Sequence, residues 1–474
     1  MQEDCIPTRI QALLSSFSSV FTRPSFETFQ VMLVGWILCP GRHTISRVAQ
    51  AASGMWQAPK HHASLYRFFS RGRWCVDALG KVLLHLALPF AGSEVTILVD
   101  DTLARRSGPH LFGAGMHHDA LRSTYASRPG TGAVAFAFGH SWVVLALIVT
   151  PPWSTSRSFA IPFLFRLYRP KKRTPASQYR KRTELAADLV RILLETLPED
   201  RTLHLVGDAE YACKTLVRSL PSNVHFTGPL PKDAALYEAP ETYRGRGRPP
   251  KRGRRLPSPK ALAEERSSRW RRCDVHIYGR DVAIQTKAIL GRWASVTGER
   301  DVRIVLTRDP SGRLADRAYF CTDAQRTVED VICTYAMRWE IEVAFRNTKQ
   351  TLGLQDAQNG WWRRPSGTRR PRKRAGPNPK GVRGQRAAEH TLPFAFSAYA
   401  IVLLWYFQCG APARDVDRSR REAPWYAHKA EPSFADMLVG FRRAIWRRRL
   451  SLLPQSKLDP AKSHPLLAGW MLAA

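Results

Sequence analysis

The sequence is poor in acidic residues and lacks paired cysteines. Asp and Glu number 39 against 73 Lys and Arg, which gives a formal net charge of +34 over 474 residues. A field this positive favours a polyanionic partner, and nucleic acid is the main candidate. The eight cysteines include no Cys-x-x-Cys pair. This argues against a zinc ribbon or a disulfide framework and fits a reducing cytoplasm.

The chain also lacks a recognisable export or membrane signal. Its first residues, Met-Gln-Glu-Asp-Cys, are acidic where a signal peptide is basic. The most apolar segment, 393–411, is near the lower length limit for a membrane span and stands alone between basic segments. We interpret it as a buried helix and expect a cytoplasmic protein with no membrane partner. With 44% hydrophobic residues, the chain can bury a core and form two or three domains.

The most informative stretch runs from Tyr335 to Lys349. It has no Gly or Pro, and its composition favours one continuous helix. At about 100° per residue, Glu340 projects roughly 140° away from Tyr335. The opposite face carries a phenol, two guanidiniums, a carboxylate and an ammonium: Tyr335, Arg338, Glu342, Arg346 and Lys349.

A stripe that faces a core would be apolar, and a solvated stripe would more often pair its charges one to one. We therefore interpret this face as one metal-binding carboxylate, Glu342, among phosphate-binding groups. Those groups are Tyr335, Arg338, Arg346 and Lys349. The alternative interpretation is an ordinary amphipathic surface helix on which these charges fall by chance.

The spacing Tyr-x2-Arg-x3-Glu-x6-Lys, formed by Tyr335, Arg338, Glu342 and Lys349, resembles the signature of bacterial insertion-sequence transposases. These enzymes form a cut-and-paste branch of the DDE superfamily. The resemblance implies an α/β fold with an RNase H-like catalytic core and a β-rich insertion. It also implies three catalytic carboxylates that bind metal ions.

The β-branched run Val95–Thr102 predicts a strand that ends in two carboxylates, Asp100 and Asp101. Open α/β sheets place their chemistry at the carboxyl ends of buried strands. In the resembled family the first catalytic aspartate is followed by a threonine. The resemblance therefore selects Asp101, which precedes Thr102, and Asp100 is the alternative. Taken alone, Asp-Asp-Thr can equally be a strand-to-turn cap.

The second carboxylate follows from the order of the predicted elements. Strands over 139–149 and 159–168, a helix over about 183–196 and a strand over 202–207 precede Asp208. Three strands, a helix and a fourth strand is the RNase H-like order. Asp208-Ala-Glu-Tyr resembles the second motif of the family, which makes Asp208 the second catalytic residue. We interpret Glu210 as a bystander that faces elsewhere.

The segment between Asp208 and Glu342 is 133 residues long and reads largely as β-structure, which fits the implied insertion. From 241 to 272 it holds twelve Lys and Arg against three Glu. Gly247-Arg248-Pro249 looks like an AT-hook, which lays arginines in a narrow minor groove. The expected DNA-binding residues of this loop are Arg246, Arg248, Lys251 and Arg252. The alternative is a solvated, disordered charge run.

These features divide the chain into five segments. Residues 1–90 form a helical N-terminal domain, either a DNA-binding bundle or a plain helical one. Residues 91–230 form the first part of the RNase H-like core, and 231–325 form the β-rich insertion with its basic loop. Residues 326–411 complete the core with the signature helix, and 412–474 form a basic tail.

Asp101, Asp208 and Glu342 are thus the expected catalytic and metal-binding residues. Hard oxygen ligands of this kind suit Mg²⁺ or Mn²⁺, and two such ions can activate water or a 3′-hydroxyl for in-line displacement at phosphorus.

The resemblance implies cleavage at insertion-sequence ends and strand transfer into target DNA. The implied partner is double-stranded DNA bound by a homodimer at the bacterial nucleoid, with no small-molecule cofactor. Two other functions remain open: an inactive DNA-binding descendant and an RNase H-like nuclease.

Overall fold

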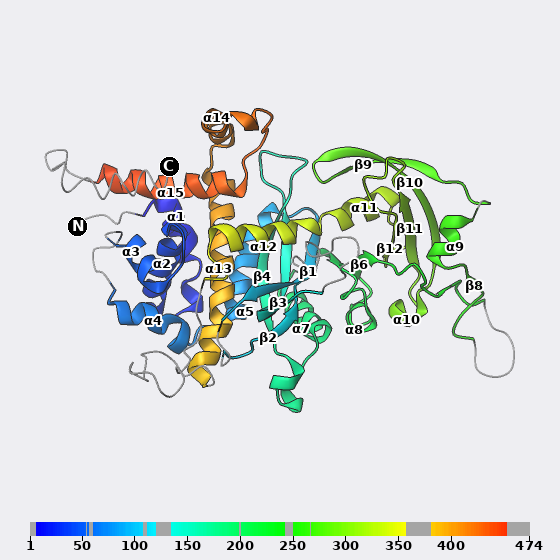
Figure 1. Ribbon diagram of the computed structural model, residues 1–474, viewed down its shortest axis with the longest axis horizontal. Helices are drawn as coiled ribbons and strands as arrows, with labels where there is room; N and C mark the ends of the chain where they lie inside the picture. The colour runs from blue at the N-terminus through cyan, green and yellow to red at the C-terminus, as the bar shows by residue number, and fades with distance from the viewer. Residues whose placement is uncertain are drawn as a thin grey trace.

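A computed structural model describes residues 6–53, 55, 60–107, 111–119, 134–198, 201–241, 250–265, 267–356 and 381–452. Within these ranges one long mixed sheet runs through the molecule. Helices cover its first half, and an all-antiparallel extension forms its second half (Figure 1).

The first half of the sheet has the RNase H-like strand order. β1 (Glu94–Arg105) pairs antiparallel with β3 (Phe136–Val149), which pairs antiparallel with β4 (Phe159–Tyr168). On its other side β1 pairs parallel with β5 (Thr202–Gly207), and β5 pairs parallel with β6 (Val224–Pro229). The spatial order is therefore β4-β3-β1-β5-β6, and the fold class predicted from the sequence is confirmed.

Pro162 lies in β4, which pairs with the outer side of β3. The short strand β2 (Gly115–His118) and β4 both pair with β3 there, one after the other along its length. Pro162 in β4 lies opposite Ala146, and the register shifts between Leu145 and Ala146. An edge strand with a bulge tolerates the missing N–H of proline.

The second half of the sheet comes from the segment after β6. β12 (Arg317–Cys321) pairs antiparallel with β6, and the sheet continues through β11 (Val302–Arg308), β10 (Arg280–Gly291) and β9 (Arg271–Ile277). The inserted strands therefore extend the catalytic sheet itself. Smaller elements of this segment are β7 (Leu236–Tyr237), β8 (Arg255–Leu256), α9 (Pro259–Glu264) and α10 (Ala294–Thr297), and α8 (Lys214–Val217) lies between β5 and β6.

Helices cover the first half of the sheet. α5 (Val76–Ala87), α12 (Trp339–Thr351) and α13 (Val382–Cys409) pack on β4, and α7 (Arg182–Leu194) packs on β3 and β4. A capping box starts α7, because the Glu184 side chain accepts a hydrogen bond from the Lys181 backbone N–H at 2.8 Å.

α13 is the central helix of the core. Of the helices in the described part of the chain, it alone is long and apolar enough to cross a membrane by length and composition. However, 89% of its most apolar window is buried inside the protein. A helix that is apolar all round belongs in a core, as the interpretation of segment 393–411 expected.

The N-terminal helices pack on α13. α1 (Thr8–Ser15), α2 (Arg23–Leu38) and α4 (His62–Arg71) contact it directly, and α3 (Ile45–Ala51) packs on α2 and α4. The ring of Phe394 in α13 lies between 5.2 and 6.0 Å from the rings of four of their aromatic residues, namely Phe29, Trp36, Phe68 and Phe69. These helices therefore share one core with the helices of the catalytic sheet.

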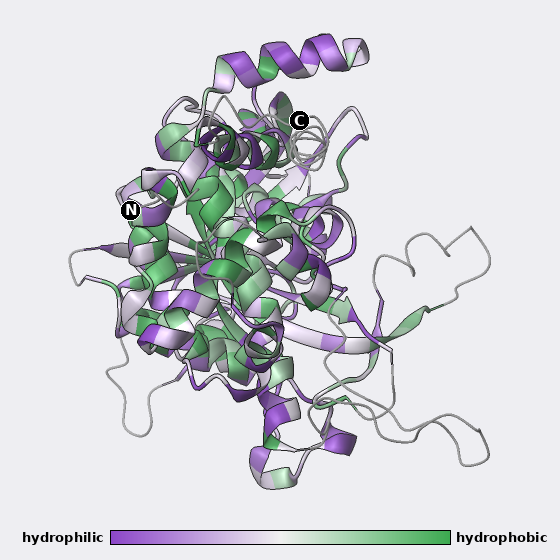
Figure 2. Cartoon of the chain, turned by 90° about the vertical axis from the view of Figure 1, so that its left-hand side faces the viewer, coloured by the Kyte–Doolittle hydropathy of each residue, from purple (hydrophilic) through white to green (hydrophobic). Residues whose placement is uncertain are grey.

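The C-terminal helices follow α13. α15 (Phe434–Ser451) packs on α13, whereas α14 (Pro412–Glu422) projects beyond it and is strongly hydrophilic (Figure 2).

The signature stretch is two helices and not one, so the prediction of a continuous helix is wrong. α11 (Val328–Ala336) ends before Met337, and α12 starts at Trp339. Between them the backbone N–H groups of Arg338 and Glu340 bond to the carbonyls three residues earlier, at 3.1 and 2.9 Å. This tighter turn has no Gly or Pro to cause it. Contacts of the Arg338 side chain with distant residues, described below, favour it instead.

A buried polar network ties α11 to the start of the sheet. Arg326 Nη1 donates to Glu94 Oε1 at 2.7 Å and to His204 Nδ1 at 2.9 Å. His204 Nε2 then lies 2.7 Å from Thr227 Oγ1, to which it donates. Burial raises the pKa of Glu94, but its interactions with His204 and Arg326 outweigh burial and lower that pKa to about 2.

We expect Glu94→Gln to lower the free energy of unfolding by about 1–3 kcal/mol at pH 7. Because the folded-state pKa lies below the usual 4.5, the stabilising effect of Glu94 is present above pH 4.5 and is lost as pH falls toward 2. Urea unfolding of wild type and variant should therefore show a gap that shrinks between pH 5 and pH 3. The exposed Glu299→Gln serves as control. A gap that stays constant over this range would contradict the role of Glu94.

Candidate active site

Three aspartates gather where the parallel pairing of β1 and β5 ends. That pairing runs to Val99 opposite Gly207, so Asp100 and Asp208 come next on neighbouring strands. β1 itself continues to Arg105. The prediction that the strand ends at Asp100 and Asp101 is therefore wrong, because antiparallel pairing with β3 carries β1 onward after β5 stops.

Arg338 joins this point of the sheet to the signature segment. Its Nη1 donates to Asp100 Oδ2 at 2.9 Å, and its Nη2 donates to Glu342 Oε1 at 2.6 Å. Asp100 Oδ1 also accepts a hydrogen bond from the Asp101 backbone N–H at 2.7 Å. One guanidinium therefore holds carboxylates from β1 and α12 in the same cluster.

Asp101 belongs to a second cluster, because adjacent residues of a strand point to opposite faces. Ser141 Oγ on β3 donates to Asp101 Oδ2 at 3.3 Å, and Arg182 Nε on α7 lies 3.6 Å from the same oxygen. Arg182 Nη1 also lies 3.4 Å from Glu210 Oε1. Each of the two neighbouring aspartates thus has its own arginine, and each arginine has its own glutamate.

Burial and mutual repulsion act on these carboxylates. Burial, with the charges of Asp101 and Asp208, holds the pKa of Asp100 well above its usual range, although Arg338 opposes the shift. Burial raises the pKa of Asp101 to about 6 against the charge of Arg182, and Glu210 and Asp208 add to the rise. The site therefore concentrates negative charge that an added cation would stabilise.

Lys349 lies within electrostatic reach of the same site. Burial and the charge of Arg105 lower the pKa of Lys349 to about 8, although Asp119, Asp101 and Asp100 oppose the shift. Lys349 is therefore still mainly charged at pH 7, and it adds a third cation, after Arg338 and Arg182, whose charge acts on Asp100 and Asp101.

The donor set fits a divalent metal ion by its chemistry. Asp100, Asp101, Asp208 and Glu342 offer hard carboxylate oxygens, and the first two are buried at a cost that a cation would reduce. In this arrangement Arg338 occupies the position between Asp100 and Glu342. In the part of the chain that the structure describes, no three His, Cys, Asp or Glu side chains are grouped closely enough to hold a metal ion.

Two other predicted phosphate-binding residues are Tyr335 and Arg346, and the ring centre of Tyr335 lies 5.9 Å from the Arg338 guanidinium carbon. Tyr335 is 7% exposed on α11, and its ring lies 4.6 Å from that of Tyr319. Arg346 is exposed on α12, and its charge opposes the burial that raises the pKa of Glu340 to about 7. Glu340 therefore titrates apart from the carboxylate cluster, consistent with the predicted orientation of its side chain.

The described residues next to the basic loop of the insertion lie away from the carboxylates. Arg246 and Arg248 are outside the described residues. Lys251 and Arg252 are exposed, and Arg252 stacks on Tyr237 with its guanidinium carbon 4.9 Å from the ring centre. Tyr237 pairs with Arg292 at the end of β10, and Figure 1 shows β8 at the far end of the molecule from β1.

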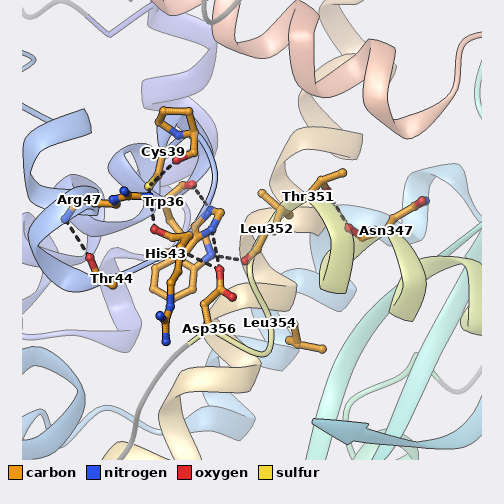
Figure 3. Close-up of polar contacts among 12 residues, drawn as sticks. Trp36, Cys39, His43, Thr44, Arg47, Asn347, Thr351, Leu352, Leu354 and Asp356 are labelled. Atoms are coloured by element: carbon orange, nitrogen blue, oxygen red, sulfur yellow. Dashed lines mark hydrogen bonds and ion pairs between the residues drawn. The ribbon is translucent and has the colours of Figure 1, made fainter. Parts of the chain in front are cut away.

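The N-terminal helices hold the C-terminal end of α12 (Figure 3). Trp36 Nε1 donates to the Leu352 carbonyl at 2.8 Å, and the His43 backbone N–H donates to Asp356 Oδ2 at 2.9 Å. Gly353 turns the chain between them with φ +56°. A Cβ there would lie 2.3 Å from His43 Nδ1 and 2.5 Å from Asp356 Oδ2. The helix that carries Glu342 is therefore fixed at one end by Arg338 and at the other by this turn.

Sequence reasoning missed Arg182, Ser141 and Tyr211. Tyr211 is fully buried, and its hydroxyl has no hydrogen-bond partner among the described residues, although the charges of Asp101 and Asp100 act on it. Arg182 was visible only as the last residue of a basic linker, and Ser141 as an interruption of an apolar strand. Neither feature of the sequence shows that these side chains lie near Asp101, since that follows only from the pairing of the strands.

Two family models match the sequence. Residues 16–289, more than half of the chain, match the family model described as DDE superfamily endonuclease, and residues 297–369 match that of the archaeal putative transposase ISC1217. No curated protein matches the sequence.

Among solved structures, this chain is similar to a piggyBac transposase synaptic complex with hairpin DNA. It shares 9% identity with a TM-score of 0.38, over 98% of this chain and 82% of that one. At this identity and TM-score, the similarity supports no conclusion about the function of this chain.

The turn after α12 can be tested with a matched pair of glycines. Gly312 also has positive φ (+70°), but a Cβ there would meet nothing within 4 Å. Gly312→Ala should cost about 1–2 kcal/mol from backbone strain alone. Gly353→Ala should cost about 1–3 kcal/mol more because the Cβ overlaps His43 and Asp356. Urea unfolding measures both, and equal losses would contradict the close packing of this turn.

Proposed function

Because this chain belongs to the DDE superfamily of endonucleases, we propose that it is a DNA transposase. It would cut phosphodiester bonds at the ends of an insertion sequence and join the freed 3′-ends to target DNA. The match of its later residues to a transposase family supports this choice within the superfamily.

The observation that carries the proposal is the cluster around Arg338. Asp100 and Glu342 share one guanidinium, and Asp208 follows the strand next to Asp100. These residues come from β1, α12 and the end of β5, so three elements far apart in the sequence converge there. A buried structural ion pair needs only one carboxylate for each arginine. Burial, together with the charges of neighbouring carboxylates, raises the pKa of both Asp100 and Asp101, and such a site suits bound cations.

Enzymes of the DDE superfamily generally use divalent metal ions, and we propose that Asp208, Glu342 and a β1 aspartate hold Mg²⁺ or Mn²⁺. When bound, such ions activate the attacking oxygen and stabilise the leaving oxygen at phosphorus. The sequence motif favours Asp101 as the β1 ligand. The shared Arg338 favours Asp100, which faces the same side as Glu342.

The cations of the site have a separate role in this proposal. The Arg338 guanidinium presents donors in a planar fork that matches two phosphate oxygens. Once it leaves Asp100 and Glu342, it can bind the phosphodiester that enters between them. Lys349, charged below about pH 8, would hold the adjacent phosphate. Both residues would position the strand without taking part in bond breaking.

We also propose that two copies act together on double-stranded DNA, because transposition joins two ends. The net charge of +34 supports a DNA partner. Lys251 and Arg252, exposed beside the loop that contains Arg246 and Arg248, are candidates for a separate DNA contact.

Cleavage of a linear duplex that carries the gene's own flanking sequences, with Mg²⁺ or Mn²⁺, tests the proposal. Asp208→Asn and Glu342→Gln should each lower site-specific cleavage by at least about 100-fold. Asp100→Asn and Asp101→Asn, compared side by side, identify the β1 ligand as the variant with the larger loss. Glu340→Gln is the matched control on the same helix and should cut like wild type.

The outcomes separate the candidate functions. Breaks at the flanking ends that depend on Asp208 and Glu342 support a transposase. Breaks without regard to the ends would indicate an RNase H-like nuclease. Tight DNA binding with no cutting by wild type would indicate an inactive descendant. Loss of cutting in Glu340→Gln with full activity in Glu342→Gln would contradict the assignment of the helix face.

A further inference from the structure

The connection between β4 and α7 is a cationic projection that the catalytic cluster leaves unexplained. We call residues 169–182 the β4–α7 arm. It holds seven Lys and Arg and no Asp or Glu in 14 residues. Figure 1 shows the chain after β4 projecting beyond α7 and β2, away from the sheet, and the lowest part of Figure 2 shows a mainly hydrophilic projection.

The arm is held in one conformation. It contains two short 3₁₀ turns, Lys171–Arg173 and Ala176–Gln178. Arg169 stacks over Phe112 at 5.0 Å and donates to Gln178 Oε1 at 3.2 Å, which closes the arm on itself.

A second anchor holds the arm to β2 and β3. Arg173 stacks over Phe138 at 5.5 Å and donates to the Ala114 carbonyl at 3.2 Å. Two of the seven cations, Arg169 and Arg173, thus anchor the arm. The backbone that carries the other five is therefore held in place.

Four of the remaining cations face solvent: Lys171, Lys172, Arg180 and Lys181. In the described ranges none of them forms an ion pair with a carboxylate. An ordinary solvated surface mixes charges of both signs. Four exposed like charges on a fixed base repel one another, and a polyanion would relieve that repulsion.

The arm ends inside the candidate active site. Its last residue, Arg182, stacks over Tyr168 at 4.7 Å and lies 3.6 Å from Asp101 and 3.4 Å from Glu210. The arm therefore carries exposed cations near its start, at Lys171 and Lys172, and again just before Arg182, which lies beside the β1 carboxylate of Asp101.

We propose that the β4–α7 arm binds the phosphodiester backbone of the duplex that occupies the carboxylate site. The proposal rests on the proposed function for its substrate. Lysines and arginines on a fixed surface suit contacts with phosphates that do not depend on sequence. The arm therefore serves to hold the duplex in place, and end recognition belongs to other parts of the chain.

The test compares two quadruple variants of the full chain that lose the same charge. The arm variant is Lys171→Gln, Lys172→Gln, Arg180→Gln and Lys181→Gln. The control removes four exposed cations elsewhere: Arg9→Gln, Lys260→Gln, Arg280→Gln and Arg313→Gln. Fluorescence anisotropy measures binding of a labelled duplex with the flanking sequences between 50 and 200 mM salt, with EDTA present. Thermal unfolding verifies that both variants fold.

Removing one lysine or arginine that binds a phosphate should reduce the magnitude of the slope of log K against log salt by about 0.9. We therefore expect the slope of the arm variant to be smaller by about 2–4 and its binding at 150 mM salt to be at least about 10-fold weaker. The control should keep the wild-type slope within about 0.5. Equal reductions in both variants would mean that only net charge matters and would overturn the proposal.

Three further outcomes keep the proposals apart. Wild type that cuts DNA, with an arm variant of unchanged slope, would overturn the role of the arm alone. Wild type that never cuts, with the expected fall in slope, would overturn the proposed function and leave DNA binding by the arm intact. An arm variant that binds DNA normally but no longer binds anionic phosphatidylserine vesicles would assign the arm to a membrane surface and overturn the proposal.

Discussion

The candidate active site depends on one buried cation, the guanidinium of Arg338. It lies between Asp100 on the central strand and Glu342 on α12, with hydrogen bonds of 2.9 and 2.6 Å. Removing one partner from a buried pair leaves an uncompensated charge and typically costs about 3–5 kcal/mol. The same contacts explain why the signature segment breaks at Met337 and Arg338, since the tight turn brings the side chain toward β1. The fold thus places a positive charge where the proposed chemistry needs a metal ion or a phosphate.

The rest of the structure fixes the two sides of that contact. β1 is held by antiparallel pairing with β3 and parallel pairing with β5, which stops one residue before Asp100. α12 is held at its far end by Trp36 and His43 from the N-terminal helices. Those helices share their core with α13, so the first and last parts of the described chain both support α12.

Much of the fold could be predicted from the sequence, and the reasons are local. Thr202–Gly207 and Phe159–Tyr168 were predicted with the bounds that the structure shows, because β-branched and aromatic runs between turns have few alternatives. The break at Arg338 could not be predicted, since its cause is a contact with Asp100, 238 positions away. The Asp101–Arg182–Glu210 cluster could not be predicted either, because only the folded sheet brings Ser141 and Arg182 to Asp101. Adjacent Asp100 and Asp101 face opposite sides of a sheet, and no motif says which side α12 covers.

The most direct measurement of the central claim is anomalous diffraction from crystals grown with Mn²⁺. The account predicts a Mn²⁺ peak about 2.0–2.6 Å from carboxylate oxygens of Asp208, Glu342 and one β1 aspartate, with the Arg338 guanidinium displaced from Asp100 and Glu342. The β1 aspartate that ligates the ion would be identified at the same time. An Arg338 that keeps both ion pairs at saturating Mn²⁺, with no peak among these carboxylates, would contradict the account and leave the cluster a structural ion pair.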